Sequence, residues 1–334
     1  MRPIKIVGSD TDLHDYQVRI HLDRSNFPLE KCKPDGSDIR FRDDSGEILP
    51  YWIERWNAAE GVIWCKIPFI PAESSKFIWM IYGNPNAKSE SNGNAVFELF
   101  DVQGIKAFWH MDEPQWMGAT GEVKDEIGVN HGTAKNGATT TSDAKYGRAG
   151  YFDGENDYVE VPDDDSLDIT DEITIEAWVN GVYSGASKGI LDKGNSGDGW
   201  EVNYYAYFNS GKARFVIGDG SSYNMVMTSD LIDYQWYHIA FTLDADYLKA
   251  YVNGNFCNRL DRSINPKTNN DNLLIGSLTT EPKFLFNGII DELRIYNRAL
   301  NPTEIQILSK NYMQKMGSYF NVRKYVTPAP VVIV

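Results

Sequence analysis

The feature that most constrains this chain is a hydrophobic alternation with a period of two residues, which recurs along most of its length while helical periodicity is scarce. Alternation places one face of an extended segment in a core and the other in solvent, so the pattern predicts β-strands. Turn-rich pieces such as KPDGSD and NPNA separate the segments. The clearest early strands are 18–22, 38–42, 62–67 and 77–82. They predict an all-β unit that ends near Phe100, and a second set of strands begins near Lys106.

Residues 236–255 predict a pair of adjacent strands and the turns that follow each of them. Each strand has apolar residues on one face: Ile239, Phe241 and Leu243 on the first, Leu248, Ala250 and Val252 on the second. Residues 244–246 supply the first turn. Asn253-Gly254 follows, and this dipeptide favours a type I′ turn because both central positions need a positive φ.

Residues 301–313 carry the one convincing helical pattern. Asn301 is the expected N-cap, Pro302 and Glu304 occupy the first and third helical positions, and Ile305, Leu308 and Tyr312 lie on one side. The pattern predicts a short helix on the outside of a sheet sandwich. The apolar, proline-interrupted segment 324–334 that follows is either a terminal edge strand or the stump of a linker.

The charge balance limits the classes of partner. The chain has 32 Lys and Arg against 47 Asp and Glu, a formal net charge of −15. This excess argues against nucleic acid or an anionic membrane surface as the main partner and favours cation binding. Cys32, Cys65 and Cys257 have no metal-ligand spacing and are expected to be buried free thiols. No apolar run approaches the roughly 20 residues that span a bilayer, and no signal-peptide core follows Met1.

Residues 104–312 resemble a laminin-G-like domain, a concanavalin A-type jelly roll. The motifs that carry the resemblance are KAFWHMDE (106–113), VKDEIGVNHGTA (123–134), YGRAGYFDGENDYVEVP (146–162), ITIEAWV (173–179), QWYHIAFTLDADYLKAYVNG (235–254) and FNGIIDELRIYNRALNPTEIQIL (286–308). Residues 1–101 resemble an uncharacterised β-rich domain that often precedes such jelly rolls in archaeal and bacterial surface proteins, through DYQVRIHL, GSDIRFRD, LPYWIERW and IWCKIPFIP. The resemblance implies an all-β protein: an N-terminal β-sandwich over 1–101, a jelly-roll sandwich with one short C-terminal helix over 104–312, and a tail or edge strand over 313–334.

An acidic stretch raises the question of what neutralises it. FDGENDYVEVPDDD, residues 152–165, has seven carboxylates in fourteen positions and no Lys, Arg or His. Laminin-G-like sandwiches commonly hold one structural Ca²⁺ where this turn meets the last strand, and the resemblance implies Asp153 and Asp291 as ligands. Ca²⁺ takes about six to eight oxygen ligands, and a glycine-containing turn presents carbonyls beside carboxylates, so Asp157 and Asn156 join the predicted set. A solvated acidic loop is the alternative, and residues 163–165 with Asp168 are expected to be a solvated turn.

A catalytic pair is the second possibility that the acids raise. Glu172, Thr174 and Glu176 share one face of a predicted strand that resembles the acidic strand of some jelly-roll glycosidases. Retaining hydrolysis needs two carboxyl groups about 5 to 5.5 Å apart, whereas positions i and i+4 of a strand have Cβ atoms roughly 13 Å apart. Thr174 also occupies the position at which a third acid would shift the pKa values of the pair. We therefore expect no catalytic residue, and we expect structural roles for His110 and His238.

A contact surface is expected in residues 194–212, where a Gly/Ser/Asn loop precedes an aromatic strand. Trp200, Val202 and Tyr204 are expected on one face of this strand and Tyr205 and Tyr207 on the other, and one face must fill the core. Rings bordered by amides and carboxylates suit sugar recognition. The predicted ligand contacts are Asp198, Trp200, Asn203, Tyr205 and Tyr207. Aromatic packing between the sheets with a polar hairpin is the alternative.

These observations predict a non-catalytic module of an extracellular or cell-surface protein that binds a glycan or a neighbouring protein and holds one structural Ca²⁺. Two other classes stay open. One is a structural or adhesive spacer, or a virion fibre component, that assembles by strand addition. The other is a glycoside hydrolase or lyase that uses Glu172 and Glu176.

Overall fold

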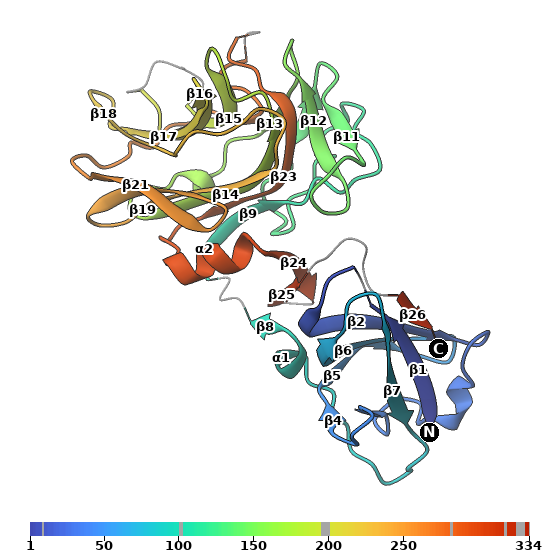
Figure 1. Cartoon of the computed structure of the whole chain (residues 1–334). Helices are drawn as coiled ribbons and strands as arrows, with labels where there is room; N and C mark the ends of the chain where they lie inside the picture. The colour runs from blue at the N-terminus through green and yellow to red at the C-terminus, as the bar shows by residue number, and fades with distance from the viewer. Residues whose placement is uncertain are drawn as a thin grey trace. The chain divides into compact units, whose positions relative to one another are not determined.

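The computed structural model describes residues 1–8, 10–99, 103–194, 201–280, 283–316, 319–324 and 331–333. The chain divides into two units, Met1–Asp101 with Lys310–Val334, and Val102–Ser309 (Figure 1). Both consist almost entirely of antiparallel strands, which confirms the predicted all-β class. None of the helices in the described ranges is long and apolar enough to cross a membrane.

Two sheets of the first unit enclose one core. Its elements are β1 (Arg2–Val7), β2 (Leu13–Asp23), η1 (Leu29–Lys31), β3 (Arg40–Arg42), β4 (Ile48–Leu49), β5 (Tyr51–Trp56), β6 (Glu60–Ile70), β7 (Ser75–Ile81), α1 (Gly93–Val96), β8 (Glu98–Leu99), β24 (Asn311–Met316), β25 (Tyr319–Lys324) and β26 (Val331–Ile333). The sheets have the orders β26-β1-β7-β3-β4 and β2-β6-β5. Apolar residues of both sheets, such as Ile6, Ile20 and Ile78, are fully buried in the shared core.

The C-terminal segment returns to this first unit. β26 pairs antiparallel with β1, with Val332 opposite Ile6, and β24 and β25 form a small sheet with β8. Of the two expectations for the C-terminal residues, the structure therefore shows an edge strand at Val331–Ile333. Val332 packs against the core of the first unit.

The second unit is a sandwich of two larger sheets. Its elements are β9 (Ile105–Trp109), β10 (Thr133–Lys135), β11 (Thr139–Thr141), β12 (Ala149–Asp153), β13 (Tyr158–Val161), η2 (Asp165–Leu167), β14 (Ile173–Gly181), β15 (Lys188–Lys193), β16 (Tyr204–Asn209), β17 (Lys212–Gly218), β18 (Tyr223–Met227), β19 (Tyr237–Leu243), β20 (Tyr247–Val252), β21 (Asn255–Asp261), β22 (Leu273–Ile275), β23 (Asn287–Tyr296) and α2 (Pro302–Leu308). One sheet has seven strands in the order β10-β13-β22-β15-β16-β17-β18. The other has the order β11-β12-β23-β14-β19-β20-β21, with β9 also paired to β23. Figure 1 shows the two sheets face to face, and their inward apolar side chains form the core.

The locally predicted elements are confirmed with one exception. β19, β20 and β21 follow one another, and Asn253 and Gly254 have φ values of 49° and 78°, as a type I′ turn requires. Asn301 caps α2 with a full capping box to Glu304. The helix ends at Leu308, however, and not at residue 313, because the chain enters β24 from Asn311 onward.

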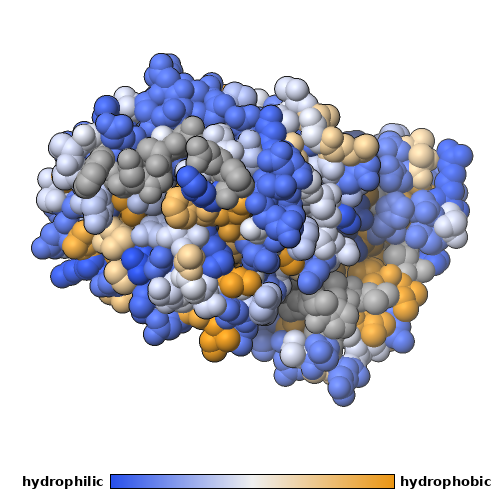
Figure 2. Space-filling model, turned by 90° about the horizontal axis from the view of Figure 1, so that it is seen from above, coloured by the Kyte–Doolittle hydropathy of each residue, from blue (hydrophilic) through white to orange (hydrophobic). Residues whose placement is uncertain are grey.

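Hydrophobic side chains reach the surface as scattered patches within a largely hydrophilic surface on the side that Figure 2 shows. Scattered apolar residues are ordinary on a soluble surface, so a binding site has to be sought in specific groups of side chains.

Candidate functional site

The outward face of the seven-stranded sheet carries the tyrosines that the sequence singled out. Tyr204 and Phe208 of β16 point into the main core, while Tyr205 belongs to a second apolar cluster on the other side of the sheet, against which Tyr207 packs. This confirms that Tyr204 lies on one face and Tyr205 and Tyr207 on the other, but Val202, expected beside Tyr204, belongs to the cluster of Tyr205. A core needs only one face, so the outward side chains are the ones that can meet a ligand.

Cross-strand register places Tyr207 beside Arg214, and Arg214 beside Met227. We call these three residues the Tyr207 row. The Tyr205 and Tyr207 rings stack with their centroids 5.4 Å apart, and the Arg214 guanidinium lies 5.8 Å from the Tyr207 centroid. The Tyr207 hydroxyl donates to Met225 Sδ at 3.6 Å. Tyr205 is only 7% exposed, whereas all three members of the Tyr207 row are half-buried. The row is therefore an accessible part of this face, which Met225 and the 48% exposed Tyr223 of β18 extend.

The other predicted ligand contacts have different surroundings. Asn203 is fully buried, and its Nδ2 donates to the carbonyl of Ile169 at 3.1 Å. It therefore holds the start of β16 in place and presents no amide to the surface. Asp198 and Trp200 lie outside the described residues.

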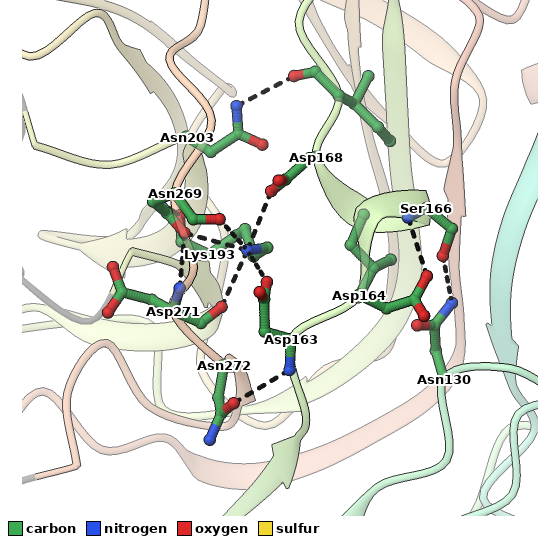
Figure 3. A network of polar contacts seen from close by, with 12 residues as sticks. Asn130, Asp163, Asp164, Ser166, Asp168, Lys193, Asn203, Asn269, Asp271 and Asn272 are labelled. Carbon is green, nitrogen blue, oxygen red and sulfur yellow. Dashed lines mark hydrogen bonds and ion pairs between the residues drawn. The ribbon is translucent and has the colours of Figure 1, made fainter.

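The acidic run at residues 163–168 is neutralised by a lysine, which the sequence analysis did not anticipate. The Lys193 side chain is fully buried, and its Nζ lies 2.7 Å from Asp163 Oδ1 and 3.1 Å from Asp168 Oδ1. Nζ also donates to the carbonyl and the Oδ1 of Asn269, at 3.2 and 3.0 Å, and to the carbonyl of Asp271 at 2.9 Å (Figure 3). Five oxygens thus surround one ammonium group, and we call this arrangement the Lys193 cage.

The Lys193 cage joins three segments at the start of β16. The carbonyl of Lys193 accepts from Asn269 Nδ2 at 3.0 Å and from the backbone N of Asn203 at 2.9 Å. The expectation of a solvated turn at residues 163–168 is therefore wrong for Asp163 and Asp168, whose carboxylates pair with the buried ammonium. Further along the acidic stretch, Glu160 pairs with Lys135 at 3.0 Å. Burial opposes ionisation there, but Lys135 and Asn272 hold the pKa of Glu160 below its ordinary value.

The structure separates Asp291 from the other three predicted calcium ligands. Asp153 lies opposite Asn287 in the pairing of β12 with β23, so Asp291 is four residues farther along β23, a distance of about 13 Å. Asp153 Oδ1 accepts from the backbone N of Glu155 at 2.8 Å, and Asp157 Oδ2 accepts from the backbone N of Asp153 at 3.2 Å. Asn156 lies exposed in the same turn. This turn therefore stabilises itself through backbone hydrogen bonds.

Asp291 has a different neighbour, Asp112. Asp291 Oδ2 accepts from the backbone N of Tyr146 at 2.8 Å, and Asp112 Oδ1 accepts from the backbone N of Arg148 at 2.6 Å, so one loop binds both carboxylates. Asp291 is fully buried, and its Oδ1 has no hydrogen-bond partner within the described part of the chain. Burial and the charges of Glu292 and Asp112 raise the pKa of Asp291, and burial also raises the pKa of Asp112.

The chemistry of this pair fits a bound cation. The buried Asp291 carboxylate and the exposed Asp112 carboxylate repel each other, and an orphaned buried carboxylate oxygen costs free energy unless a cation or a donor meets it. The Lys145 ammonium lies near Asp291 but sits over the Trp178 ring, 4.0 Å from its centroid. No group of three or more acidic, histidine or cysteine side chains is placed to hold a metal ion in the described ranges, so carbonyls would have to complete the coordination.

Glu176, one of the two acids of the catalytic alternative, is enclosed in a buried ionic network. Glu176 is 1% exposed, its Oε1 accepts from Arg294 Nη1 at 2.7 Å, and its Oε2 lies 2.5 Å from His238 Nε2. Arg294 also pairs with Glu292, which lies 2.5 Å from His110 Nδ1. Both histidines thus have the structural roles that the sequence analysis expected.

The two acids of the predicted pair have different surroundings. Burial opposes ionisation of Glu176, but Arg294 and His238 hold its pKa below the ordinary value. Glu172, in contrast, is exposed and accepts from the backbone N of Ala299 at 3.2 Å. One carboxylate is in solvent and the other is sealed in ion pairs, so the two do not line one substrate site as glycoside hydrolysis requires.

Two protein-family models match parts of this chain. Residues 153–306 match the concanavalin A-like lectin/glucanases superfamily, and residues 35–116 match a domain of unknown function (DUF2341). These matches confirm both resemblances that the sequence motifs indicated. A comparison with curated proteins gives no match.

Solved structures give three examples of a similar fold. Domain 4 of AbnA, an extracellular arabinanase from Geobacillus stearothermophilus, in complex with arabinotriose, is 20% identical with a TM-score of 0.49, covering 62% of this chain and 98% of that one. The binding domain of Paraclostridial Mosquitocidal Protein 1 is 17% identical with a TM-score of 0.48, covering 62% and 52%. The ligand-binding domain of botulinum neurotoxin serotype D, in complex with N-acetylneuraminic acid, is 12% identical with a TM-score of 0.46, covering 65% and 62%. The chain therefore spans nearly all of the arabinanase domain and between half and two thirds of the other two structures.

Proposed function

Because residues 153–306 match the concanavalin A-like lectin/glucanases superfamily, we propose that this chain is a non-catalytic module of an extracellular or cell-surface protein that binds a glycan through the Tyr207 row. The family match supports the fold, and the burial of Glu176 supports a non-catalytic role. A location on a virion surface is the alternative setting for the same module.

The observation that carries the proposal is the half-buried Tyr207 ring, with Tyr205 stacked behind it and Arg214 beside it. A supported ring offers a flat apolar surface to the C–H face of a sugar, and a neighbouring guanidinium donates hydrogen bonds to hydroxyl or carboxylate oxygens. Asn209, half-buried at the end of β16, adds an amide beside the row.

A glycan array with the full chain tests the proposal. We expect saturable binding to a subset of glycans and a loss of about tenfold or more in affinity for Tyr207→Ala, because a central aromatic contact dominates small interfaces. Tyr151→Ala is the matched control, since Tyr151 is 41% exposed on the other sheet of the same unit. An array without signal, or equal losses in both variants, would contradict the proposal.

We further propose that the second unit holds one structural Ca²⁺, at Asp112 and Asp291 rather than at Asp153. The raised pKa values of this pair and the orphaned Asp291 Oδ1 support this placement. A ligand that binds only the folded state stabilises it, by about 2.7 kcal/mol when its concentration is one hundred times Kd. The melting temperature of the second unit should therefore rise with added Ca²⁺, and Asp291→Asn should remove the rise. If the rise in melting temperature persists in Asp291→Asn but is absent in Asp153→Asn, the ion binds at the turn of Asp153 instead.

Self-assembly with other copies of this chain is a second candidate function, and the pairing of β26 with β1 favours it. The same three-residue segment that covers the β1 edge here can cover the β1 edge of another copy. Light scattering over a concentration series tests this: assembly should appear at high concentration and be weakened by Val332→Pro, which removes a backbone donor of β26. A chain that remains monomeric at every concentration would exclude assembly by this route.

A further inference from the structure

The first unit contains a cavity of about 590 Å³ that none of the functions above uses. It lies between the segment that follows β2 and the tip of the β5–β6 hairpin, and its lining includes Arg24, Leu29, Glu30, Cys32, Trp56 and Asn57. Its volume falls in the range of small-molecule sites, roughly 300–1,000 Å³. It lies wholly within one unit of the chain.

Two glycines seat the Trp56 ring at the wall of this cavity. A Cβ on Gly61, the strand partner of Trp56, would lie 2.3 Å from the ring atom Cζ3. A Cβ on Gly36 would lie 3.1 Å from the ring atom Cδ2, and Gly36 has a φ of +68°. The indole therefore rests against bare backbone on this side while it remains half-buried and lines the cavity.

Hydrogen bonds join the two walls of the cavity. Arg24 donates from both Nε and Nη2 to the carbonyl of Ala58, each at 3.2 Å, which ties the segment after β2 to the hairpin tip. Asn57 Oδ1 accepts from the backbone N of Ala59 and of Glu60, at 2.8 and 3.0 Å, and so fixes the tip itself. The cavity is therefore formed before any ligand arrives, which lowers the entropic cost of binding.

The residues that line the cavity suit a ligand that has one apolar face and hydroxyl groups along its edge. Leu29 and Cys32 are buried and form an apolar floor, and burial together with the Asp38 and Glu30 carboxylates raises the pKa of the Cys32 thiol to about 12, so the thiol is protonated and uncharged. At the rim, Arg24 and Glu30 have opposite charges. Such a rim gives no net preference for an anion or a cation, whereas hydroxyl groups, which both donate and accept, suit both side chains.

We propose that this cavity is a saccharide-binding site, in which Trp56 stacks on the C–H face of one sugar ring while Arg24, Glu30 and Asn57 bind its hydroxyls. The site is independent of the Tyr207 row and lies in the part of the chain that includes the domain of unknown function. Together the two units would bind polysaccharide at two points, and linked weak sites raise the overall affinity.

Indole N–H signals of the ¹⁵N-labelled full chain test the proposal. The chain has 9 tryptophans, and Trp56→Phe identifies the signal of Trp56. The probes are the methyl glycosides of glucose, galactose, mannose and N-acetylglucosamine. At least one of them should shift the Trp56 signal saturably, and Trp56→Ala should lower its affinity about tenfold or more. Trp56→Phe keeps a ring in place and should lower the affinity only a few-fold.

Matched variants show whether the glycoside binds at this cavity or elsewhere on the molecule. Glu30→Gln, which removes a charged acceptor at the rim, should weaken binding about threefold, whereas Glu47→Gln, an exposed acid at the β3–β4 turn, should leave it unchanged. Tyr207→Ala should also leave the Trp56 response intact, so failure here and failure of the Tyr207 row are distinguishable. The proposal is overturned if no glycoside moves the Trp56 signal, if Trp56→Ala binds as well as the parent chain, or if a proline-rich peptide saturates the site and the glycosides do not.

Discussion

Replacing Lys193 by methionine would leave the oxygens of the Lys193 cage without their shared cation. Methionine keeps most of the side-chain volume, so the change removes charge and hydrogen bonds with little effect on packing. Breaking a buried ion pair by removing one partner costs about 3–5 kcal/mol, because the remaining charge stays buried and unpaired. Asp163 is 31% exposed and water can hydrate it, so the lower end, about 3 kcal/mol, applies here.

This free energy converts into a measurable shift in melting temperature. Unfolding entropy is about 2.1 cal/mol/K per residue, so roughly 200 residues in Val102–Ser309 give about 0.4 kcal/mol/K. A loss of about 3 kcal/mol then lowers the melting temperature of the second unit by about 7 °C. Differential scanning calorimetry should show this shift in one transition and leave the transition of the first unit in place.

A neighbouring lysine on the same strand provides the control. Lys188 begins β15 and is half-buried, and its Nζ donates to the carbonyls of Ser184 and Ala186. Lys188→Met should change stability by less than about 1 kcal/mol. A double-mutant cycle of Lys193→Met with Asp168→Asn should show a coupling of about 1–3 kcal/mol. Equal shifts for the two lysine variants, or no coupling to Asp168, would refute the assignment of the ammonium as the counter-charge.

Three further substitutions test other parts of the structure. Without Ca²⁺, Asp291→Asn should stabilise the second unit at neutral pH. The raised pKa of Asp291 means that its contribution is most favourable below the unfolded value and is lost as pH rises through the folded value, so the advantage of the variant should vanish in acid by thermal melts. Glu176→Gln should cost about 3–5 kcal/mol at neutral pH, because it breaks the buried pair with Arg294. The lowered pKa of Glu176 gives stability above its unfolded value that is lost as pH falls through the folded value, so the cost should shrink in acid, and a pH-independent cost would contradict this. Gly61→Ala should destabilise the first unit by about 1–3 kcal/mol in urea titrations, because its Cβ meets Trp56 at 2.3 Å, and an unchanged midpoint would show that the ring moves freely.

Local features of the fold could be predicted because their causes lie within a few residues. The turn at Asn253-Gly254 and the cap at Asn301 need only neighbouring side chains and a tolerated φ, and both are present as expected. The end of α2 could not be predicted from its apolar spacing, since Tyr312 continues the helical pattern in sequence while the backbone there pairs as β24. Tertiary pairing overrides a local preference of this size.

The polar sites depended on register and on long-range contacts, and here the sequence was less informative. Alternation is preserved when a strand slips by two residues, so it did not show that Asp153 lies opposite Asn287 and away from Asp291. Lys193 and Asp271 are 78 positions apart, so no local pattern connects them. One signal was available in retrospect: Lys193 closes a strand that contains Ile190 and Leu191 in an acid-rich domain, and a lysine at a buried position needs oxygens around it.

The return of the C-terminal segment to β1 has a consequence for biosynthesis. The first unit is discontinuous in the chain, since Val331–Ile333 completes a sheet that begins with Arg2–Val7. Ribosomes add about 5–20 residues per second, so the roughly 320 residues between the two strands delay this last strand by about 16–65 s. For that time one side of β1 presents unpaired backbone groups to every other nascent chain nearby. Expression conditions that slow translation should therefore favour aggregation of this protein more than that of a chain whose sheets close in the order in which they are made.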